Sequence, residues 1–340
     1  RMVFTVLRFQ PIRFAEEEWN EFCKSDDIQL VEPTFTKREE FIQELKDGKF
    51  KDVDFIARTF QSASISGNFD KEIITLLNEY TNVKGIAHCG AGYDQIDAKS
   101  CSEFNIEVSN VPDKVSASTA DTNLFLILAT MRNFQLGHNN LMNGKWENDV
   151  NCASTPLGHS IQNKIVGILG MGGIGCTVRD RLSGFGLKKV VYYNRSRLSP
   201  ELEKDSEYCS TIEELIKESD VISINLPLNK ETFHIINEEL IDKMKTGVTI
   251  VNTARGPVVD EKAIKKGILS GKIYGYGSDV FENEPFIDKE FVSMEQVTSL
   301  PHMGAATSET IKSMEVHVLD NVKSYYENGR VLTPVWECRK

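Results

Sequence analysis

A glycine pattern near the middle of the chain limits the possible folds more than any other feature of the sequence. Residues 164–175 read KIVGILGMGGIG, in which an apolar run of strand length leads into Gly170, Gly172 and Gly175, and a helix-compatible segment follows. In this G-x-G-x-x-G spacing the three glycines permit, in order, a tight turn, close approach of the backbone to a pyrophosphate, and close packing of the helix on the sheet. The pyrophosphate would lie at the helix N-terminus, which favours anions. Because a strand precedes it and a helix follows it, the pattern predicts a dinucleotide-binding site rather than an incidental glycine turn.

Short apolar runs alternate with helical patterns along most of the chain, which predicts an α/β protein with two doubly wound parallel-sheet halves. The glycine pattern belongs to the second half, and a final helix is expected at 308–329. The expected strands are residues 3–7, 28–31, 53–57, 83–88 and 106–110 in the first half, and 165–169, 188–194, 220–228, 248–254, 272–280 and 296–300 in the second.

Two segments connect the halves. Residues 116–134 carry apolar side chains at helical spacing and predict a packed linking helix. The polar residues 137–160 show no clear periodicity and predict a loop, and a loop of this length usually has a function.

Charge and composition narrow the possible partners and compartment. The net charge of −11 argues against nucleic-acid binding, which needs a positive surface. The apolar run at 124–131 is far shorter than the ~20 residues of a membrane span, so we expect a soluble protein. The seven cysteines are scattered and form no C-x-x-C pair, which favours reduced thiols, no metal site and a cytoplasmic location.

The residues after the second strand of the nucleotide-binding half indicate the form of the cofactor. An acidic residue at this corner normally binds the adenosine ribose of NAD, whereas arginine accommodates the 2′-phosphate of NADP. Here Asn194, Arg195, Ser196 and Arg197 follow the strand, and no carboxylate stands among them. Guanidinium groups suit a phosphate dianion, so the sequence predicts NADP(H) in preference to NAD(H), with a solvated basic loop as the alternative.

Further motifs stand at the ends of predicted strands: TARG with Arg255, ENEP with Glu284 and PHMG with His302, besides GAGYDQID from Gly90. Together with the glycine pattern, in this order and spacing, they make the chain resemble the D-2-hydroxyacid dehydrogenase family over nearly its whole length. It is most similar to the glyoxylate and hydroxypyruvate reductases of that family. The resemblance implies a Rossmann domain at 113–307 inserted into a flavodoxin-like substrate domain formed by 1–112 and 308–340.

The resemblance also implies an enzyme that reduces small 2-oxo acids such as glyoxylate and hydroxypyruvate. Arg255 would bind the carboxylate and carbonyl of the substrate through a bidentate guanidinium. His302 would be the general acid that protonates the carbonyl oxygen as hydride reaches carbon 2. Glu284 would bind the other ring nitrogen of His302 and favour the charged imidazolium.

Contacts to cofactor, substrate and a second subunit follow from the same resemblance. Ala91 and Gly92 would offer backbone N–H groups to the substrate carboxylate, although an ordinary glycine turn explains that stretch equally well. An arm at 137–163 would bind a second subunit in a homodimer and could place Trp146 in its active site, or Trp146 could be only an interface anchor. The implied cofactor contacts, besides the glycines of the pattern and Asn194–Arg197, are Thr119, Gly173, Ile174, Pro227, Thr253, Ala254, Asp279 and Gly304.

Two other functions stay open at this point. The chain could be an NAD-dependent dehydrogenase of another D-2-hydroxy acid, or a corepressor of the same fold that uses NAD(H) to control partner binding. In either case a cleft between two α/β halves favours hinge closure, with hinges near the start of the linking helix and just past His302.

Overall fold

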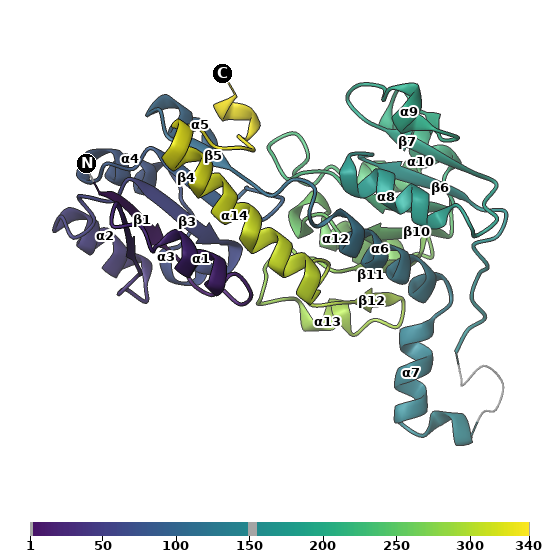
Figure 1. Cartoon of the computed structure of the whole chain (residues 1–340). Coiled ribbons are helices and arrows are strands. Elements are labelled where there is room, and N and C mark those ends of the chain that lie inside the picture. Colours follow the sequence, from purple (N-terminus) through teal and green to yellow (C-terminus); the bar gives the residue numbers. More distant parts are fainter. Residues whose placement is uncertain (1–2, 149–154, 340) are drawn as a thin grey trace. The chain divides into compact units, whose positions relative to one another are not determined.

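The computed structural model describes residues 3–148 and 155–339. The chain forms two compact units (Figure 1): unit 1 comprises Arg1–Val115 and Ala306–Lys340, and unit 2 comprises Ser116–Ala305. Unit 2 is therefore an insertion in the sequence of unit 1.

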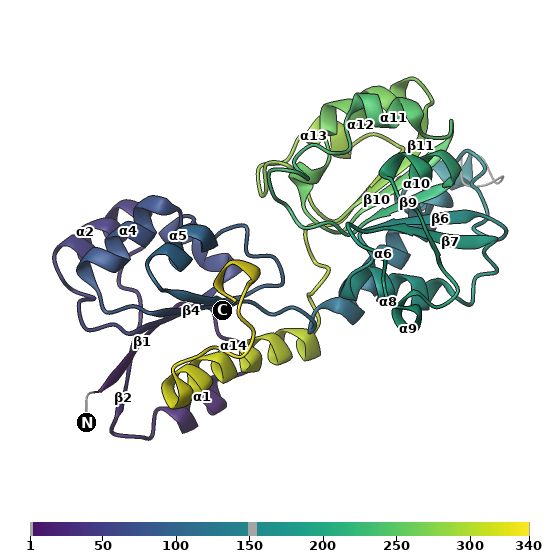
Figure 2. The same cartoon turned by 90° about the horizontal axis from the view of Figure 1, so that it is seen from above.

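Unit 1 contains a five-stranded sheet in the order β2-β1-β3-β4-β5, with every neighbouring pair parallel. This is the flavodoxin-like strand order. Figure 2 shows α2, α4 and α5 on one face of the sheet and α1 and α14 on the other. The bounds are β1 Phe4–Arg8, α1 Glu16–Phe22, β2 Ile28–Val31, α2 Arg38–Lys46, β3 Phe55–Thr59, α3 Ala63–Ser66, α4 Lys71–Tyr80, β4 Gly85–Cys89, α5 Ala98–Glu103, β5 Glu107–Ser109 and α14 Ser308–Asn328, with short 3-10 turns at Phe60–Ser62 and Trp336–Cys338.

Unit 2 contains a seven-stranded parallel sheet in the order β12-β11-β10-β9-β6-β7-β8. The order reverses between β6 and β9, so the loop after β6 lies at the topological switch point where Rossmann folds bind ligands. The bounds are α6 Ser116–Met131, α7 Phe134–Met142, β6 Ile165–Leu169, α8 Gly173–Leu182, β7 Lys189–Tyr193, α9 Pro200–Glu203, β8 Glu207–Tyr208, α10 Ile212–Glu218, β9 Val221–Ile224, α11 Glu238–Lys243, β10 Val248–Asn252, α12 Glu261–Leu269, β11 Ile273–Ser278, α13 Lys289–Val292 and β12 Val297–Ser299, with 3-10 turns at Lys145–Glu147 and Gly256–Val258. The two predicted parallel α/β sheets are thus confirmed.

The helices begin where the sequence supplies side-chain caps. Asp70 accepts a hydrogen bond from the N–H of Ile73 at the start of α4, and Asp260 caps α12 in the same way. Thr307 caps α14, which ends at Gly329 in the left-handed conformation. Such caps satisfy N–H groups that have no partner inside the helix.

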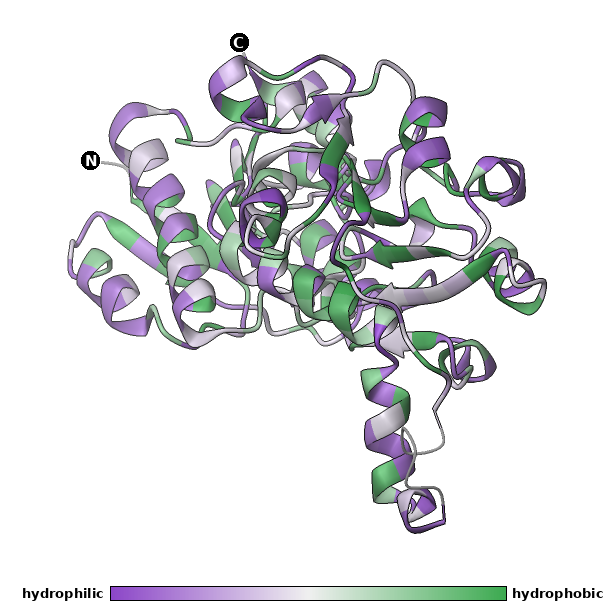
Figure 3. Cartoon of the chain, turned by 90° about the vertical axis from the view of Figure 1, so that its right-hand side faces the viewer, coloured by the Kyte–Doolittle hydropathy of each residue, from purple (hydrophilic) through white to green (hydrophobic). Residues whose placement is uncertain are grey.

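The prediction of a loop throughout 137–160 is wrong in its first part. The linking helix α6 ends at Met131, and a separate helix, α7, extends from the body of unit 2 (Figure 1, Figure 3). Its apolar side chains are exposed in the single chain, with Met142 at 72% and Leu141 at 51% exposure. The helix was not recognised because the expected loop starts inside it, at Gly137, and because the polar residues His138, Asn139 and Asn140 interrupt its apolar ones. Part of the predicted arm, including Cys152, lies outside the described residues.

Within the described residues no helix is long and apolar enough to cross a membrane. The six cysteines described there are all free thiols.

Candidate active site

The glycine loop after β6 has the geometry that a pyrophosphate requires. Gly170 has a φ of +91°, and a Cβ atom there would lie 2.9 Å from the Asn225 carbonyl oxygen. A Cβ atom at Gly175 would lie 2.4 Å from the carbonyl oxygen of Gly170, so the close packing of α8 on β6 excludes a side chain. At Gly172 an added Cβ meets no atom within 4 Å and points into open space. Because the backbone is exposed at this point and begins a helix, the loop fits a bound dinucleotide.

The corner after β7 is tied to this loop. The Asn194 Oδ1 atom accepts a hydrogen bond of 2.7 Å from the Met171 N–H, and its Nδ2 atom donates to the Met171 carbonyl at 3.2 Å. Asn194 therefore holds the middle of the glycine loop, while Arg195 and Ser196 are exposed.

No carboxylate stands among Asn194–Arg197, but one reaches this corner from further along the chain. Glu203, at the end of α9, brings its carboxylate to Arg197 with N–O distances of 2.6 and 2.8 Å, and it accepts a third bond from the Tyr192 hydroxyl at 2.6 Å. The Arg197 guanidinium and the Tyr192 hydroxyl lower the pKa of Glu203 to about 2. The carboxylate does not come from the strand end itself. It reaches the corner because the chain turns back after Ser199, and the spacing of residues in the sequence does not predict this turn.

The TARG motif follows β10 and forms a tight turn held by Asn252. The Asn252 side chain accepts from the Ala254 N–H and donates to the Arg255 carbonyl oxygen, each at 3.0 Å. Gly256 packs so closely that a Cβ atom there would lie 1.9 Å from the carbonyl carbon of Phe281. This packing joins the turn that carries Arg255 to the segment that carries Glu284.

A buried network of polar side chains holds the Thr253 hydroxyl in place. Asn123, fully buried on α6, donates to the Thr253 hydroxyl at 2.9 Å and accepts from the Ser223 hydroxyl at 3.0 Å. Sequence reasoning missed Asn123 because it assigned α6 to apolar packing. The signal was an amide side chain immediately before the apolar run 124–131.

His302 and Glu284 form the predicted pair. The His302 Nδ1 atom lies 2.6 Å from Glu284 Oε2, and Glu284 Oε1 accepts from the Phe281 N–H at 2.8 Å. Burial alone would raise the pKa of Glu284, but the hydrogen bonds from His302 and Phe281 and the charge of Arg255 lower it. Glu284 is therefore an anion that holds the imidazole in one orientation. The His302 backbone has a φ of 52°, and its N–H donates to the Asp279 carbonyl oxygen at 2.7 Å.

Asp279 organises the segment after His302. Its carboxylate accepts from the N–H groups of Met303 and Gly304, both at 2.8 Å. Burial raises the pKa of Asp279, although these two N–H groups act in the opposite direction. A Cβ atom at Gly304 would lie 3.1 Å from Asp279 Oδ2 and 3.5 Å from the Thr119 side chain. The structure thus brings together Asp279, Gly304 and Thr119 in unit 2.

Trp146 and Pro227, which the resemblance also implies, lie outside this cluster and are more exposed. Trp146, in the turn Lys145–Glu147 after α7, is 53% exposed. Pro227 lies in the exposed segment after β9, where its carbonyl oxygen accepts from the Thr232 hydroxyl at 2.6 Å. Among the described residues, no cluster of three or more His, Cys, Asp or Glu side chains is placed to hold a metal ion.

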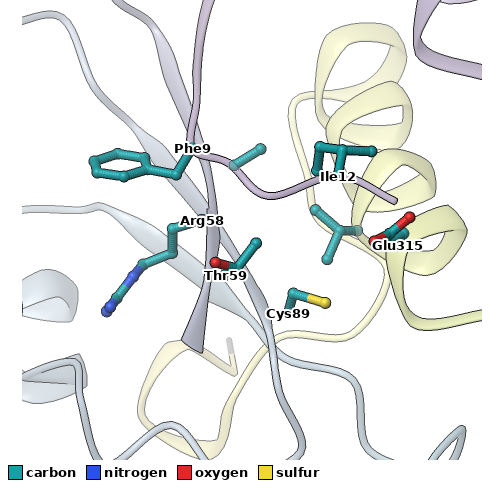
Figure 4. A pocket seen from close by; sticks show the side chains of 8 residues that line it. Phe9, Ile12, Arg58, Thr59, Cys89 and Glu315 are labelled. Carbon is teal, nitrogen blue, oxygen red and sulfur yellow. The ribbon is translucent and has the colours of Figure 1, made fainter. Parts of the chain in front are cut away.

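Ala91 and Gly92 lie in unit 1, in the loop that follows β4. A small pocket opens nearby at the carboxyl ends of β1, β3 and β4 and is lined by Phe9, Ile12, Thr59, Cys89 and Glu315, among others (Figure 4). Glu315 of α14 accepts three backbone bonds, from Arg13, Phe14 and Ala15, and so fixes the segment after β1.

A Rossmann sheet with an imidazole–carboxylate pair at its carboxyl edge defines a dinucleotide-binding oxidoreductase. The profile of the family described as D-isomer specific 2-hydroxyacid dehydrogenase, NAD binding domain, matches residues 124–304. The chain belongs to the D-isomer specific 2-hydroxyacid dehydrogenase family, as the sequence motifs predicted.

The relatives agree with this family. Glyoxylate reductase 1 of Saccharomyces cerevisiae is 45% identical over 98% of this chain and 95% of its own length. The 4-methyl-2-oxopentanoate reductase A of Aspergillus oryzae is 44% identical over 96% of each chain. The crystal structure of a glyoxylate reductase from Paecilomyes thermophila has a TM-score of 0.93 at 40% identity and covers 99% of both chains.

Proposed function

We propose that this protein reduces small 2-oxo acids, with glyoxylate and hydroxypyruvate as the first candidates, to 2-hydroxy acids with NADPH. The observation that carries the proposal is the 2.6 Å contact between His302 and Glu284 beside the TARG turn. Unit 2 would be the dinucleotide-binding domain and unit 1 the substrate-binding domain.

Each residue of the pair has a distinct role in the proposed reaction. Glu284 occupies Nδ1 of the imidazole, so Nε2 is the nitrogen that donates a proton to the carbonyl oxygen of the substrate. Arg255 binds the carboxylate and orients the carbonyl, which holds the reacting carbon in place. The bound nicotinamide supplies the hydride. Because the proton and the hydride both reach the carbonyl group, the product is the 2-hydroxy acid.

The corner after β7 supports a preference for NADPH. Arg197 is already paired with Glu203, so we assign the contact with the 2′-phosphate chiefly to Arg195 and Ser196, which are exposed. Asn194 fixes the corner against the glycine loop. Thr119, Gly173, Ile174, Pro227, Thr253, Ala254, Asp279 and Gly304 complete the proposed cofactor contacts.

The exposed apolar side chains of α7 support a homodimer as the working form. Phe134, Leu141 and Met142 are each about half exposed or more in the single chain, and a second copy would bury them. Trp146 would lie at or beyond this interface, near the substrate of the second copy.

A spectrophotometric assay tests the proposal. Purified protein is mixed with NADPH and, in turn, glyoxylate, hydroxypyruvate, pyruvate and 4-methyl-2-oxopentanoate, and the loss of NADPH absorbance is followed. Oxidation with the first two is expected, together with loss of turnover but retained NADPH binding in His302→Ala. A preference for 4-methyl-2-oxopentanoate would revise the substrate, and no oxidation with any 2-oxo acid would favour a corepressor-type binding protein.

A further inference from the structure

In the loop Gly90–Tyr93 after β4, the carbonyl groups of three successive residues are each held by a hydrogen-bond partner. The Gly90 carbonyl accepts from the Val111 N–H at 2.9 Å, and the Ala91 carbonyl accepts from the Asn110 side chain at 2.7 Å. The Gly92 carbonyl lies 3.1 Å from the Nε2 atom of His88. A carbonyl oxygen can only accept, so this nitrogen carries the proton.

These bonds fix the direction of the backbone N–H groups. In a planar trans peptide the carbonyl and the following N–H point in opposite directions. The N–H groups of Ala91, Gly92 and Tyr93 therefore face away from the side chains that hold the carbonyls. Within the described residues no hydrogen bond occupies any of the three, and all three residues are partly exposed. Backbone N–H groups without a partner on consecutive residues of a loop can form a site for an anion.

His88 is the buried side chain that holds the Gly92 carbonyl of this loop. It is 1% exposed, and a Cβ atom at Gly90 would lie 2.7 Å from its Nε2 atom. The imidazole thus fills the space beneath the loop, and only glycine fits above it.

A buried arginine lies beside it. Arg58 of β3 pairs in register with His88 of β4, so both side chains project from the same face of the sheet. Arg58 is 1% exposed and donates to Gln95 Oε1 at 3.0 Å, which anchors the far end of the loop. Desolvation lowers the pKa of Arg58 to about 10. Arg58 is also among the residues that line the pocket, and Figure 4 shows the end of its side chain directed away from Cys89 and Glu315.

We propose that His88 is a positioning residue for substrate binding: by holding the Gly92 carbonyl inside unit 1, it fixes the following Tyr93 N–H and with it the conformation of the loop whose N–H groups meet the carboxylate of the 2-oxo acid. This inference rests on the proposed function, in which Ala91 and Gly92 bind that carboxylate. Asn110 holds the same loop through the Ala91 carbonyl.

The test compares His88→Leu with His88→Gln, which restores an N–H donor. His88→Leu should raise the KM for glyoxylate about tenfold, because one hydrogen bond that orders the anion site is lost. The dissociation constant of NADPH and kcat should each stay within about twofold. His88→Gln should recover part of the KM, and Asn110→Ala should reproduce the KM effect independently.

Ile86→Val provides the matched control. Ile86 lies two residues before His88 on the same face of β4 and is fully buried, so its truncation lowers the melting temperature without touching the loop. If Ile86→Val raised the KM as much as His88→Leu, or if His88→Leu lowered only the melting temperature, the positioning role would be wrong.

Oxalate binding, measured by calorimetry on the NADPH-loaded protein, separates this inference from the proposed function. Weaker oxalate binding in His88→Leu than in the wild type supports the positioning role, even if the wild type reduces none of the four acids. Equal oxalate binding by both proteins, or none by the wild type, overturns it.

Discussion

The Nδ1 atom of His302 lies 2.6 Å from Oε2 of Glu284, while the other carboxylate oxygen of Glu284 is bound by the Phe281 N–H. The carboxylate is thus fixed by the backbone at one oxygen and fixes the imidazole with the other. Nδ1 of His302 therefore fixes the orientation of the ring, and Nε2 is left for the proposed proton transfer.

Replacing the carboxylate tests this division. Glu284→Gln keeps the shape of the side chain but removes the carboxylate that holds Nδ1 of His302, so kcat for glyoxylate should fall by about 10- to 100-fold. The dissociation constant of NADPH, measured by fluorescence titration, should stay unchanged because Glu284 contacts no proposed cofactor group. An unaltered kcat would show that the pair is structural only.

The two arginines after β7 should differ in effect. Arg195→Ala should weaken NADPH binding by about 10- to 100-fold, the size of one lost charge-assisted contact, and leave NADH binding and the melting temperature unchanged. Arg197→Ala should lower the melting temperature, because it leaves the nearly buried Glu203 without its cation. A wild-type protein that binds NADH more tightly than NADPH would contradict the assignment of the corner.

The Arg197–Glu203 pair also predicts a pH dependence of stability. The pKa of Glu203 is about 2 in the folded chain and ordinary when unfolded, so the pair stabilises the fold above ~pH 5 and this contribution disappears as the pH falls toward 2. The difference in melting temperature between wild type and Glu203→Gln should be constant at neutral pH and shrink in acid. Calorimetric scans over this range measure it, and a difference that grew in acid would reverse the sign of the argument.

Two glycines of the same loop should respond differently to alanine. Gly172→Ala adds a methyl group in open space, so the protein should fold with an unchanged melting temperature but bind NADPH at least about tenfold more weakly. Gly175→Ala places the methyl group against the Gly170 carbonyl and should lower the melting temperature directly. Equal effects of the two variants on both measurements would show that the loop does not face the pyrophosphate.

The arm makes a separate prediction. A Leu141→Ser, Met142→Ser double variant should shift sedimentation from dimer toward monomer, because it removes apolar side chains that are exposed in the single chain. Trp146→Ala should change the relative KM values for glyoxylate and larger 2-oxo acids. Unchanged selectivity would limit Trp146 to the role of an interface anchor.

The sequence predicted the parts of the site that local motifs determine. The glycine spacing and the TARG, ENEP and PHMG motifs each occupy a few consecutive residues, and each strand or helix of the alternation is likewise recognised from its own short segment. Residues that act through distant contacts were not predicted. Glu203 reaches Arg197 through the turn after Ser199, and His88 acquires its position from the register of β4 and from the loop folded over it. The helix α7 was missed because three successive polar residues, His138, Asn139 and Asn140, interrupt its apolar ones.

The insertion of unit 2 has a consequence for how the protein is made. The Val108 carbonyl accepts from the Val335 N–H at 2.9 Å, and α14 packs on β3 and β4, so the early strands of unit 1 are completed by residues that are translated after unit 2. Residues 116–305 contain every strand of their own seven-stranded sheet and can fold while still attached to the ribosome. The N-terminal strands must wait with one apolar face uncovered until α14 leaves the exit tunnel, and chaperones would protect this part of the nascent chain rather than the nucleotide-binding half.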